Sequence, residues 1–134
     1  MKPGIWATAA ICLLTANLGA AGAAPPSTSQ DALLQLKAAL QAYDDGDCSK
    51  VLSISTPALD HLDGLPDEAI AAAYEIIARC ALDVGKEEDA YAYLIKGTAL
   101  KSSSDALWAL RFEVETYQKK YDAAVSTLES LAKT

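Results

Sequence analysis

A recurrence with a period of about 34 residues in the second half of the chain constrains the fold more than any other feature of the sequence. This repeat period joins four pairs of positions, which are Tyr74 with Trp108, Ala90 with Ala124, Leu94 with Leu128 and Glu87 with Tyr121. Self-similarity at a fixed period of roughly 20 to 50 residues marks chains built from stacked supersecondary units. We therefore expect one structural unit to recur along this chain.

The composition predicts that each unit is helical. Hydrophobic residues make up 51% of the 134 residues but aromatic residues only 7%, so alanine and leucine, which favour helices, dominate the apolar content. The 7 glycines and 5 prolines are too few for the frequent turns of an all-β chain. The sequence thus predicts an all-α protein.

Apolar residues at spacings of three and four predict about six helices in three pairs. The predicted segments run from a Ser29 cap to Asp45-Gly46, from Cys48 to about Pro57, from Pro66 to about Val84 with Gly85 closing it, from Glu87 to about Lys101, from Asp105 to Gln118 with a Ser104 cap, and from Tyr121 to about Lys133. Pro57 is expected to stop or interrupt the second helix.

The N-terminal residues resemble an export signal. Lys2 gives a positive start, an apolar stretch runs from Ile5 to Leu18, and Ala21-Gly22-Ala23 suits cleavage. We predict a signal peptide over residues 1–23, a flexible spacer over residues 24–30, and a periplasmic or secreted mature protein. The alternative is an uncleaved anchor, because this uncharged stretch is about long enough to span a bilayer. A membrane partner is expected only in that case.

The middle unit, residues 71–104, carries a recognisable pattern. Its key positions are filled by Tyr74, Ile77, Ala78, Ala81, Ala90 and Leu94, with Gly85 at the turn between the helices. On these residues the chain resembles the tetratricopeptide repeat family, whose unit also has about 34 residues. The resemblance covers roughly residues 31–133, within a predicted repeat domain of residues 31–134.

The outer units fit this pattern less well. In the last unit Trp108, Ala124 and Leu128 fit, but Arg111, Phe112 and Glu115 depart from the pattern. Sliding the fifth helix by one residue brings Leu107, Leu110 and Val114 into those places and predicts a slightly longer turn at Lys119-Lys120. In the first unit about five extra residues are expected between Asp60 and Pro66.

The resemblance implies a right-handed α-solenoid of helical hairpins, a binding scaffold for a protein or peptide and not an enzyme. In this family the first helix of each unit lines a concave groove, which implies the groove residues Glu75, Arg79, Leu82, Asp83, Ala109, Glu113, Thr116 and Tyr117. The alternative fold is an ordinary helical bundle closed around one core, since alanine-rich sequences match a repeat by chance.

Cys48 and Cys80 are the cysteines left after removal of a signal peptide. In an oxidising compartment we predict a disulfide between them, because the second and third helices are expected to pack together. Two buried thiols are the alternative.

No constellation in the sequence predicts catalysis or cofactor binding. His61 is the single histidine and is interpreted as a loop residue, Asp44-Asp45-Gly46-Asp47 as a polar turn, and Glu113 with Glu115 as solvated carboxylates. No metal is expected. The net charge of −7, with Lys119-Lys120 as the only tight basic cluster, disfavours nucleic acid as a partner.

Two functions therefore stay open: an exported adaptor, or the repeat module of a larger envelope protein or enzyme whose activity lies outside this chain. A membrane-tethered adaptor is a third reading. The last helix is expected to leave Leu128 and Leu131 partly uncovered, which implies self-association, a partner at that end, or a longer protein.

Overall fold

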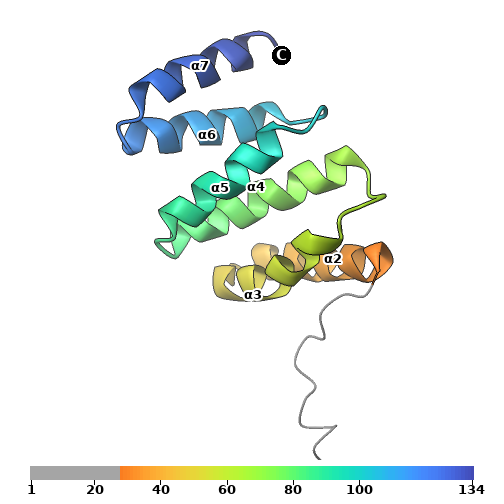
Figure 1. Ribbon diagram of the computed structural model, residues 1–134. Coiled ribbons are helices and arrows are strands. Elements are labelled where there is room, and N and C mark those ends of the chain that lie inside the picture. The colour runs from red at the N-terminus through yellow and green to blue at the C-terminus, as the bar shows by residue number, and fades with distance from the viewer. Residues whose placement is uncertain (1–27) are drawn as a thin grey trace, which may run out of the picture.

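The computed structural model describes residues 28–134, which form six α-helices, a short 3-10 helix and no strand (Figure 1). The helices are α2 (Ser29–Asp44), α3 (Cys48–Ala58), η1 (Leu59–His61, the 3-10 helix), α4 (Asp67–Asp83), α5 (Glu87–Thr98), α6 (Asp105–Tyr117) and α7 (Tyr121–Ala132). The predicted all-α class and the number of helices are confirmed. The predicted signal peptide lies outside the described residues.

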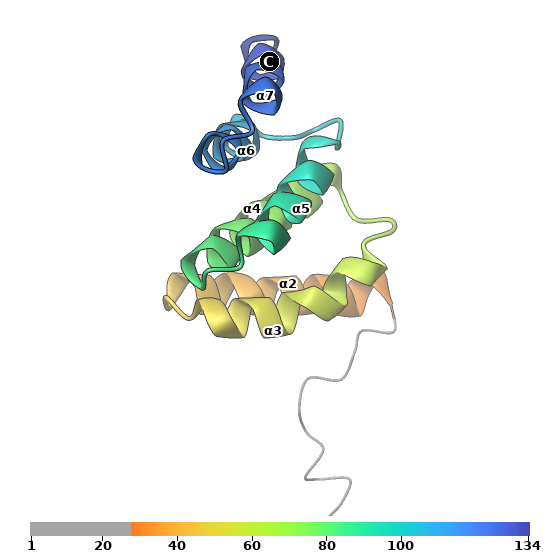
Figure 2. The same cartoon turned by 60° about the vertical axis from the view of Figure 1, so that its left-hand side comes forward.

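The helices pair as neighbours in sequence and the pairs stack in chain order. α2 packs with α3, α4 with α5 and α6 with α7, while α2 also contacts α4 and α4 contacts α6. Within residues 28–134, neither α2 nor α3 contacts α6 or α7, so the middle pair separates the outer two. Figures 1 and 2 show the resulting three layers, with α2 and α3 at one end and α7 at the other.

The three turns within these pairs share one backbone geometry. Each contains a residue with positive φ, which is Gly46 at 78°, Gly85 at 77° or Lys119 at 59°. The following N–H donates to a carbonyl five residues earlier, in the bonds from Asp47 to Ala42 (2.9 Å), from Lys86 to Ala81 (2.7 Å) and from Lys120 to Glu115 (2.8 Å). This bond, with a left-handed residue before it, defines the Schellman motif that ends many helices.

The two later turns therefore share one geometry, and their positive-φ residues, Gly85 and Lys119, lie 34 positions apart (119 − 85). The predicted longer turn at Lys119-Lys120 is wrong, because Lys119 adopts the left-handed backbone of Gly85 and no extra residue is needed. The buried apolar side chains of α6 are nevertheless Leu107, Leu110 and Val114, as the one-residue shift predicts. Trp108 is only half-buried, and its indole N–H donates to Ser103 Oγ at 2.9 Å.

Helix ends follow local capping. The side chain of Thr28, and not that of Ser29, caps α2 by accepting the N–H of Asp31, so α2 begins two residues before the predicted domain start. Ser104 caps α6 as predicted. Pro57 lies within the last turn of α3, which ends at Ala58, and η1 follows directly. The helix predicted to reach about Lys101 ends at Thr98.

Buried side chains gather between neighbouring pairs of helices. One cluster joins the middle pair to α6, through Ala71, Tyr74, Ala78, Leu94, Leu107, Leu110 and Val114. Two further clusters join α2 and α3 to α4, through Ala32, Leu36, Ala58, Ala73 and Ile77 and through Ala39, Ala42, Val51 and Cys80. Apolar burial is thus distributed along the stack, which keeps α2, α4 and α6 side by side.

Candidate functional site

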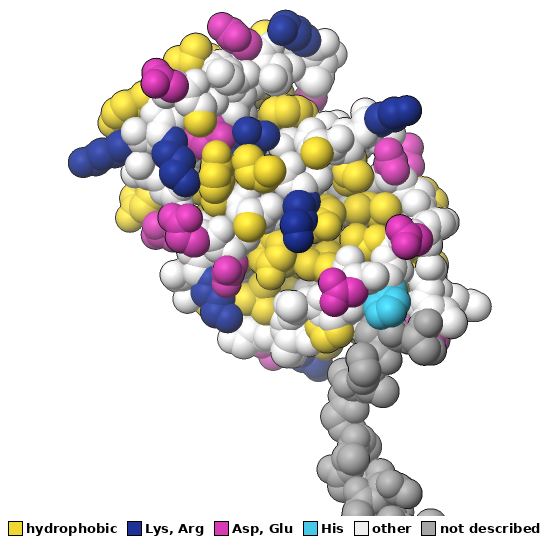
Figure 3. Space-filling view, viewed as in Figure 1, with side chains coloured by type: hydrophobic (Ala, Val, Ile, Leu, Met, Phe, Trp, Pro, Cys, Tyr) yellow, Lys and Arg dark blue, Asp and Glu magenta, His cyan; other side chains and the backbone are white. Residues whose placement is uncertain are grey.

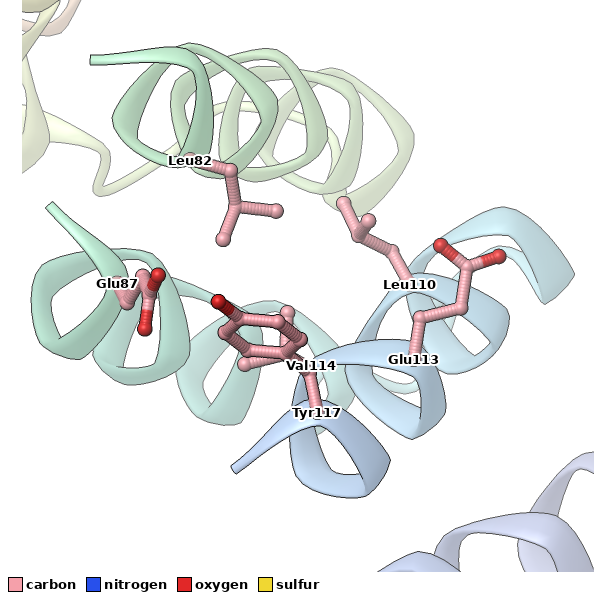
Figure 4. Close-up of a pocket in the computed structure, with 6 residues that line it drawn as sticks. All are labelled: Leu82, Glu87, Leu110, Glu113, Val114 and Tyr117. Carbon is pink, nitrogen blue, oxygen red and sulfur yellow. The ribbon is translucent and has the colours of Figure 1, made fainter. Parts of the chain in front are cut away.

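The row formed by α2, α4 and α6 carries two hollows, one on each side of α4. The larger, which we call the α4–α6 pocket, has a volume of about 380 Å³ and is lined by Leu82, Glu87, Leu110, Glu113, Val114 and Tyr117 (Figure 4). Leu82, Glu113 and Tyr117 are among the groove residues implied by the sequence. The structure therefore brings together three of those eight side chains, from two different helices.

The α4–α6 pocket has a buried apolar floor and an exposed rim. Val114 and Leu110 are only 4% and 6% exposed, whereas the Tyr117 side chain at the rim is 74% exposed. Figure 4 shows Leu82 pointing into the space from α4, with the carboxyl groups of Glu87 and Glu113 on opposite sides. The pocket thus combines apolar contact area with two acidic groups at its margins.

Neither acidic group at the pocket has a salt-bridge partner within residues 28–134. The ion pairs of this part of the chain join Arg79 to Glu75 at 3.2 Å and Arg111 to Glu115 at 2.8 Å. Glu87 and Glu113 take part in neither. The margin of the pocket therefore carries two carboxylates that form no salt bridge within this part of the chain.

A smaller hollow of about 90 Å³, the α2–α4 hollow, lies between α2 and α4. Its lining consists of Leu33, Leu36, Ala39, Leu40, Ser55, Ala69, Ala72, Ala73, Ile76 and Ile77. Leu40 is 44% exposed, so this apolar surface reaches solvent. The sequence alone did not predict this hollow. When the turn at Gly46 is aligned with the turn at Gly85, however, Leu40 corresponds to Arg79, which is one of the predicted groove residues.

The other implied groove residues do not line the α4–α6 pocket. Glu75 and Arg79 pair with each other along α4. Thr116 is exposed and its hydroxyl donates to the Phe112 carbonyl at 2.8 Å, Asp83 is exposed, and Ala109 is half-buried. Their role in binding stays a prediction.

Helices α5, α6 and α7 meet around a buried carboxylate, that of Glu115. The prediction that Glu115 is solvated is wrong, because its exposed fraction is 0%. One oxygen accepts hydrogen bonds from the Tyr91 hydroxyl at 3.1 Å and from Arg111 Nε at 2.8 Å, and the other accepts from the Thr127 hydroxyl at 2.6 Å. Two of the three residues that depart from the predicted pattern, Arg111 and Glu115, therefore form a structural ion pair.

This network extends to neighbouring side chains. Arg111 also donates to the Thr98 hydroxyl at 2.8 Å and lies 5.5 Å from the ring centroid of Trp108. The Lys120 ammonium lies 3.9 Å from the ring centroid of Tyr91. Burial, and then the negative charge of Glu115, raises the pKa of the Tyr91 hydroxyl. Burial also raises the pKa of Tyr74, so both phenols are held neutral.

Cys48 and Cys80 lie at disulfide distance. Their Cα atoms are 4.8 Å apart, although 32 residues separate them in sequence. The pair joins the start of α3 to the last part of α4, as expected from packing of the second helix on the third.

Other parts of the described chain offer less for binding or catalysis. Residues 44–47 end α2 and form the polar turn to α3, as interpreted from sequence, and His61 lies in η1. Among residues 28–134 no three His, Cys, Asp or Glu side chains are grouped to hold a metal ion. Within the same range, none of the helices has the length and apolar character needed to span a lipid bilayer.

A third hollow, of about 430 Å³, lies among η1, the start of α4 and the end of α5. It includes Leu59, Leu62, Ile70 and Leu100, with Asp60 and Lys96 in the same lining. Figure 3 shows hydrophobic side chains gathered over the middle of this face, with acidic and basic side chains around them.

Comparison with models of known families, with curated proteins and with solved structures finds no match to the chain.

Proposed function

We propose that the protein is an exported helical-repeat scaffold of the tetratricopeptide type, which binds a protein or peptide segment and catalyses no reaction. Two observations support a repeat architecture. The turns after α4 and α6 have equivalent hydrogen bonds one repeat period apart, and the three helix pairs stack in chain order. The contacts of α2 with α4 and of α4 with α6 make a continuous row of first helices.

The observation that carries the binding proposal is the pair of hollows flanking α4. Both open beside exposed large side chains, Tyr117 at 74% and Leu40 at 44%. Apolar hollows accept alternate side chains of an extended segment or the apolar face of a helix, and exposed aromatic residues are favoured as anchors at interfaces. A segment running across α4 would reach both hollows.

Export is supported by the cysteine pair. Disulfides form and persist in oxidising compartments and are rare in the cytosol. Cys48 and Cys80 lie at disulfide distance, and the first 23 residues have the pattern of a signal peptide. The proposed site of action is therefore the periplasm or the extracellular space.

The outer face of α7 supports self-association as a second interaction. Leu94 of α5 is fully buried in the cluster that α6 completes, whereas Leu128, its equivalent one repeat period later, is 49% exposed. Tyr121 and Val125 on the same helix are 60% and 57% exposed. Dissociation after Val125→Lys, measured by sedimentation velocity, tests this contact; a monomeric parent protein would rule it out.

The binding proposal is tested by selecting peptides from a random displayed library on the oxidised protein. Selected peptides are expected to bind at least tenfold more weakly to the Tyr117→Ala and Leu40→Ala variants. Ile95→Ala is the matched control, because Ile95 is 37% exposed on α5 and lines neither hollow. If no peptide is selected, or if all selected peptides bind the three variants alike, the proposed binding face is wrong.

A further inference from the structure

We infer that the α4–α6 pocket takes one arginine or lysine side chain of the bound segment. This inference rests on the proposed function and deepens it, because it assigns a chemistry to one position of the partner. It is carried by the combination of an apolar floor, two unpaired carboxylates and an exposed aromatic ring in one place.

The floor of the pocket fits the aliphatic part of such a side chain. Long basic side chains lay their methylene groups on apolar surface while their charged ends stay near water. Leu110 and Val114 supply a surface that is 6% and 4% exposed, and Leu82 closes it from α4. The volume of about 380 Å³ leaves room for a guanidinium or ammonium group beyond the methylene chain.

The margins of the pocket fit the charged end. Glu87 and Glu113 stand on opposite sides of the space and pair with no basic side chain of residues 28–134 (Figure 4). Two cations of this part of the chain have other partners, because Arg79 pairs with Glu75 and Lys120 lies over the Tyr91 ring. The net charge of −7 also favours a basic partner.

Tyr117 adds a third contact. Its ring is 74% exposed at the rim, between the two acidic residues in Figure 4. A guanidinium group stacks on an aromatic face more readily than an ammonium group, so arginine should bind more tightly than lysine. An acidic side chain is disfavoured here, because it would meet two like charges.

The α2–α4 hollow differs from the α4–α6 pocket in the chemistry of its lining. Its lining holds one serine and otherwise only alanine, leucine and isoleucine, so it offers nothing to a charged group. An apolar side chain suits that hollow. The segment recognised is therefore expected to carry an apolar residue and a basic residue on the side that faces α4.

The test uses small probes, which need no identified partner. Pentylguanidinium is titrated into the oxidised, isotope-labelled protein and amide resonances are followed by NMR, with 1-pentanol and pentanoate as probes of equal chain length. The cation is expected to shift Leu110, Val114 and Tyr117 selectively and to bind more tightly than either control. Preferential binding of pentanol or pentanoate, shifts confined to other residues, or no binding of any probe overturns the inference.

A matched pair of variants isolates the carboxylates. Glu87→Gln/Glu113→Gln is expected to weaken binding of the cation roughly fivefold, since two solvent-accessible ion pairs contribute up to about 1 kcal/mol together. Glu68→Gln/Glu129→Gln removes the same charge from exposed positions that do not line the pocket, and should change affinity less than twofold. Equal weakening in both double variants refutes the inference.

Failure of this inference differs from failure of the proposed function. If the peptide selection yields binders that need Tyr117 and Leu40 but carry no basic residue, the scaffold proposal stands and the assignment of the pocket fails. If no peptide binds the face while the cation still binds selectively, the pocket chemistry stands and the scaffold proposal fails.

Discussion

Replacing Arg111 by isoleucine should remove the one charged partner that a buried carboxylate has within residues 28–134. Glu115 is 0% exposed and accepts hydrogen bonds from Arg111, Tyr91 and Thr127, so without Arg111 only two neutral hydroxyl donors remain. Isoleucine occupies the position 34 residues earlier (111 − 34 = 77), at Ile77, which the proposed repeat makes equivalent. The substitution thus tests whether the repeat residue is tolerated beside Glu115.

The expected cost is about 3 kcal/mol in the free energy of unfolding. Removing one partner of a buried ion pair typically costs about 3 to 5 kcal/mol, and the lower end applies because the Arg111 side chain is 21% exposed. A small domain has only about 5 to 15 kcal/mol of stability in total. The variant should therefore lose a large share of its stability and keep about 2 to 12 kcal/mol, which urea unfolding can still measure.

The double variant Arg111→Ile/Glu115→Ala should recover most of this loss. It restores the pair found at Ile77 and Ala81, and an apolar pair commonly replaces a buried ion pair at little cost. The Thr127 hydroxyl would then donate to the carbonyl four residues earlier, as Thr98 does to Leu94 at 2.8 Å. We expect the double variant to lie within about 1 kcal/mol of the parent, with a coupling energy of at least about 2 kcal/mol.

The parent protein, the two single variants and the double variant form a double-mutant cycle. Their free energies of unfolding are measured by urea unfolding followed by far-ultraviolet circular dichroism. The account of the network is refuted if Arg111→Ile costs less than about 1 kcal/mol, or if the effects of the two single variants simply add.

Three further predictions concern stability. Lys119→Gly should raise the free energy of unfolding by about 0.5 to 1 kcal/mol, because Lys119 has a φ of 59° that costs an L-residue more than glycine; Lys120→Gly, at a negative φ, should give no gain in the same urea titration. Reduction of the protein, or the double substitution Cys48→Ser/Cys80→Ser, should lower the free energy of unfolding by about 3 to 4 kcal/mol, since the cysteine pair closes a loop of 32 residues. An equal urea midpoint with and without reductant in the parent protein would contradict the disulfide. The free energy of unfolding should also fall as the pH rises above about 10. In the unfolded chain the tyrosines lose their protons near pH 10.0, whereas in the folded protein burial raises the pKa values of Tyr74 and Tyr91 and keeps both hydroxyls protonated. The Tyr74→Phe variant should show a smaller fall, and an unchanged alkaline profile in this variant would contradict the burial of Tyr74.

Much of the fold was predictable because helix signals in this chain are local. Glycine at Gly46 and Gly85, the Ser104 cap and Pro66 before Asp67 each act within a few residues, and the structure starts or ends helices beside all of them. The turn at Lys119 was not predictable in the same way. Lysine rarely adopts a positive φ, so the equivalence of Lys119 with Gly85 became visible only from the hydrogen bonds of the two turns.

The candidate site was predictable only in part, since a pocket depends on how helices are rotated against each other. Leu82, Glu113 and Tyr117 were reached by placing the family's groove on α4 and α6. Glu87 belongs to the next helix and reaches the pocket only because the turn brings the start of α5 back toward α6. The burial of Glu115 was also hidden, because its partners Tyr91 and Thr127 lie on two other helices.

Site-specific photocrosslinking in cells that express the full chain tests the central claim most directly, that a partner segment lies along α2, α4 and α6. A photoreactive phenylalanine derivative is placed at Tyr117, at Leu40 and, as control, at Ile95 on α5. We predict that Tyr117 and Leu40 give the same crosslinked partner and that Ile95 gives none. Adducts at Ile95 alone, or different partners at Tyr117 and Leu40, would contradict a single binding face.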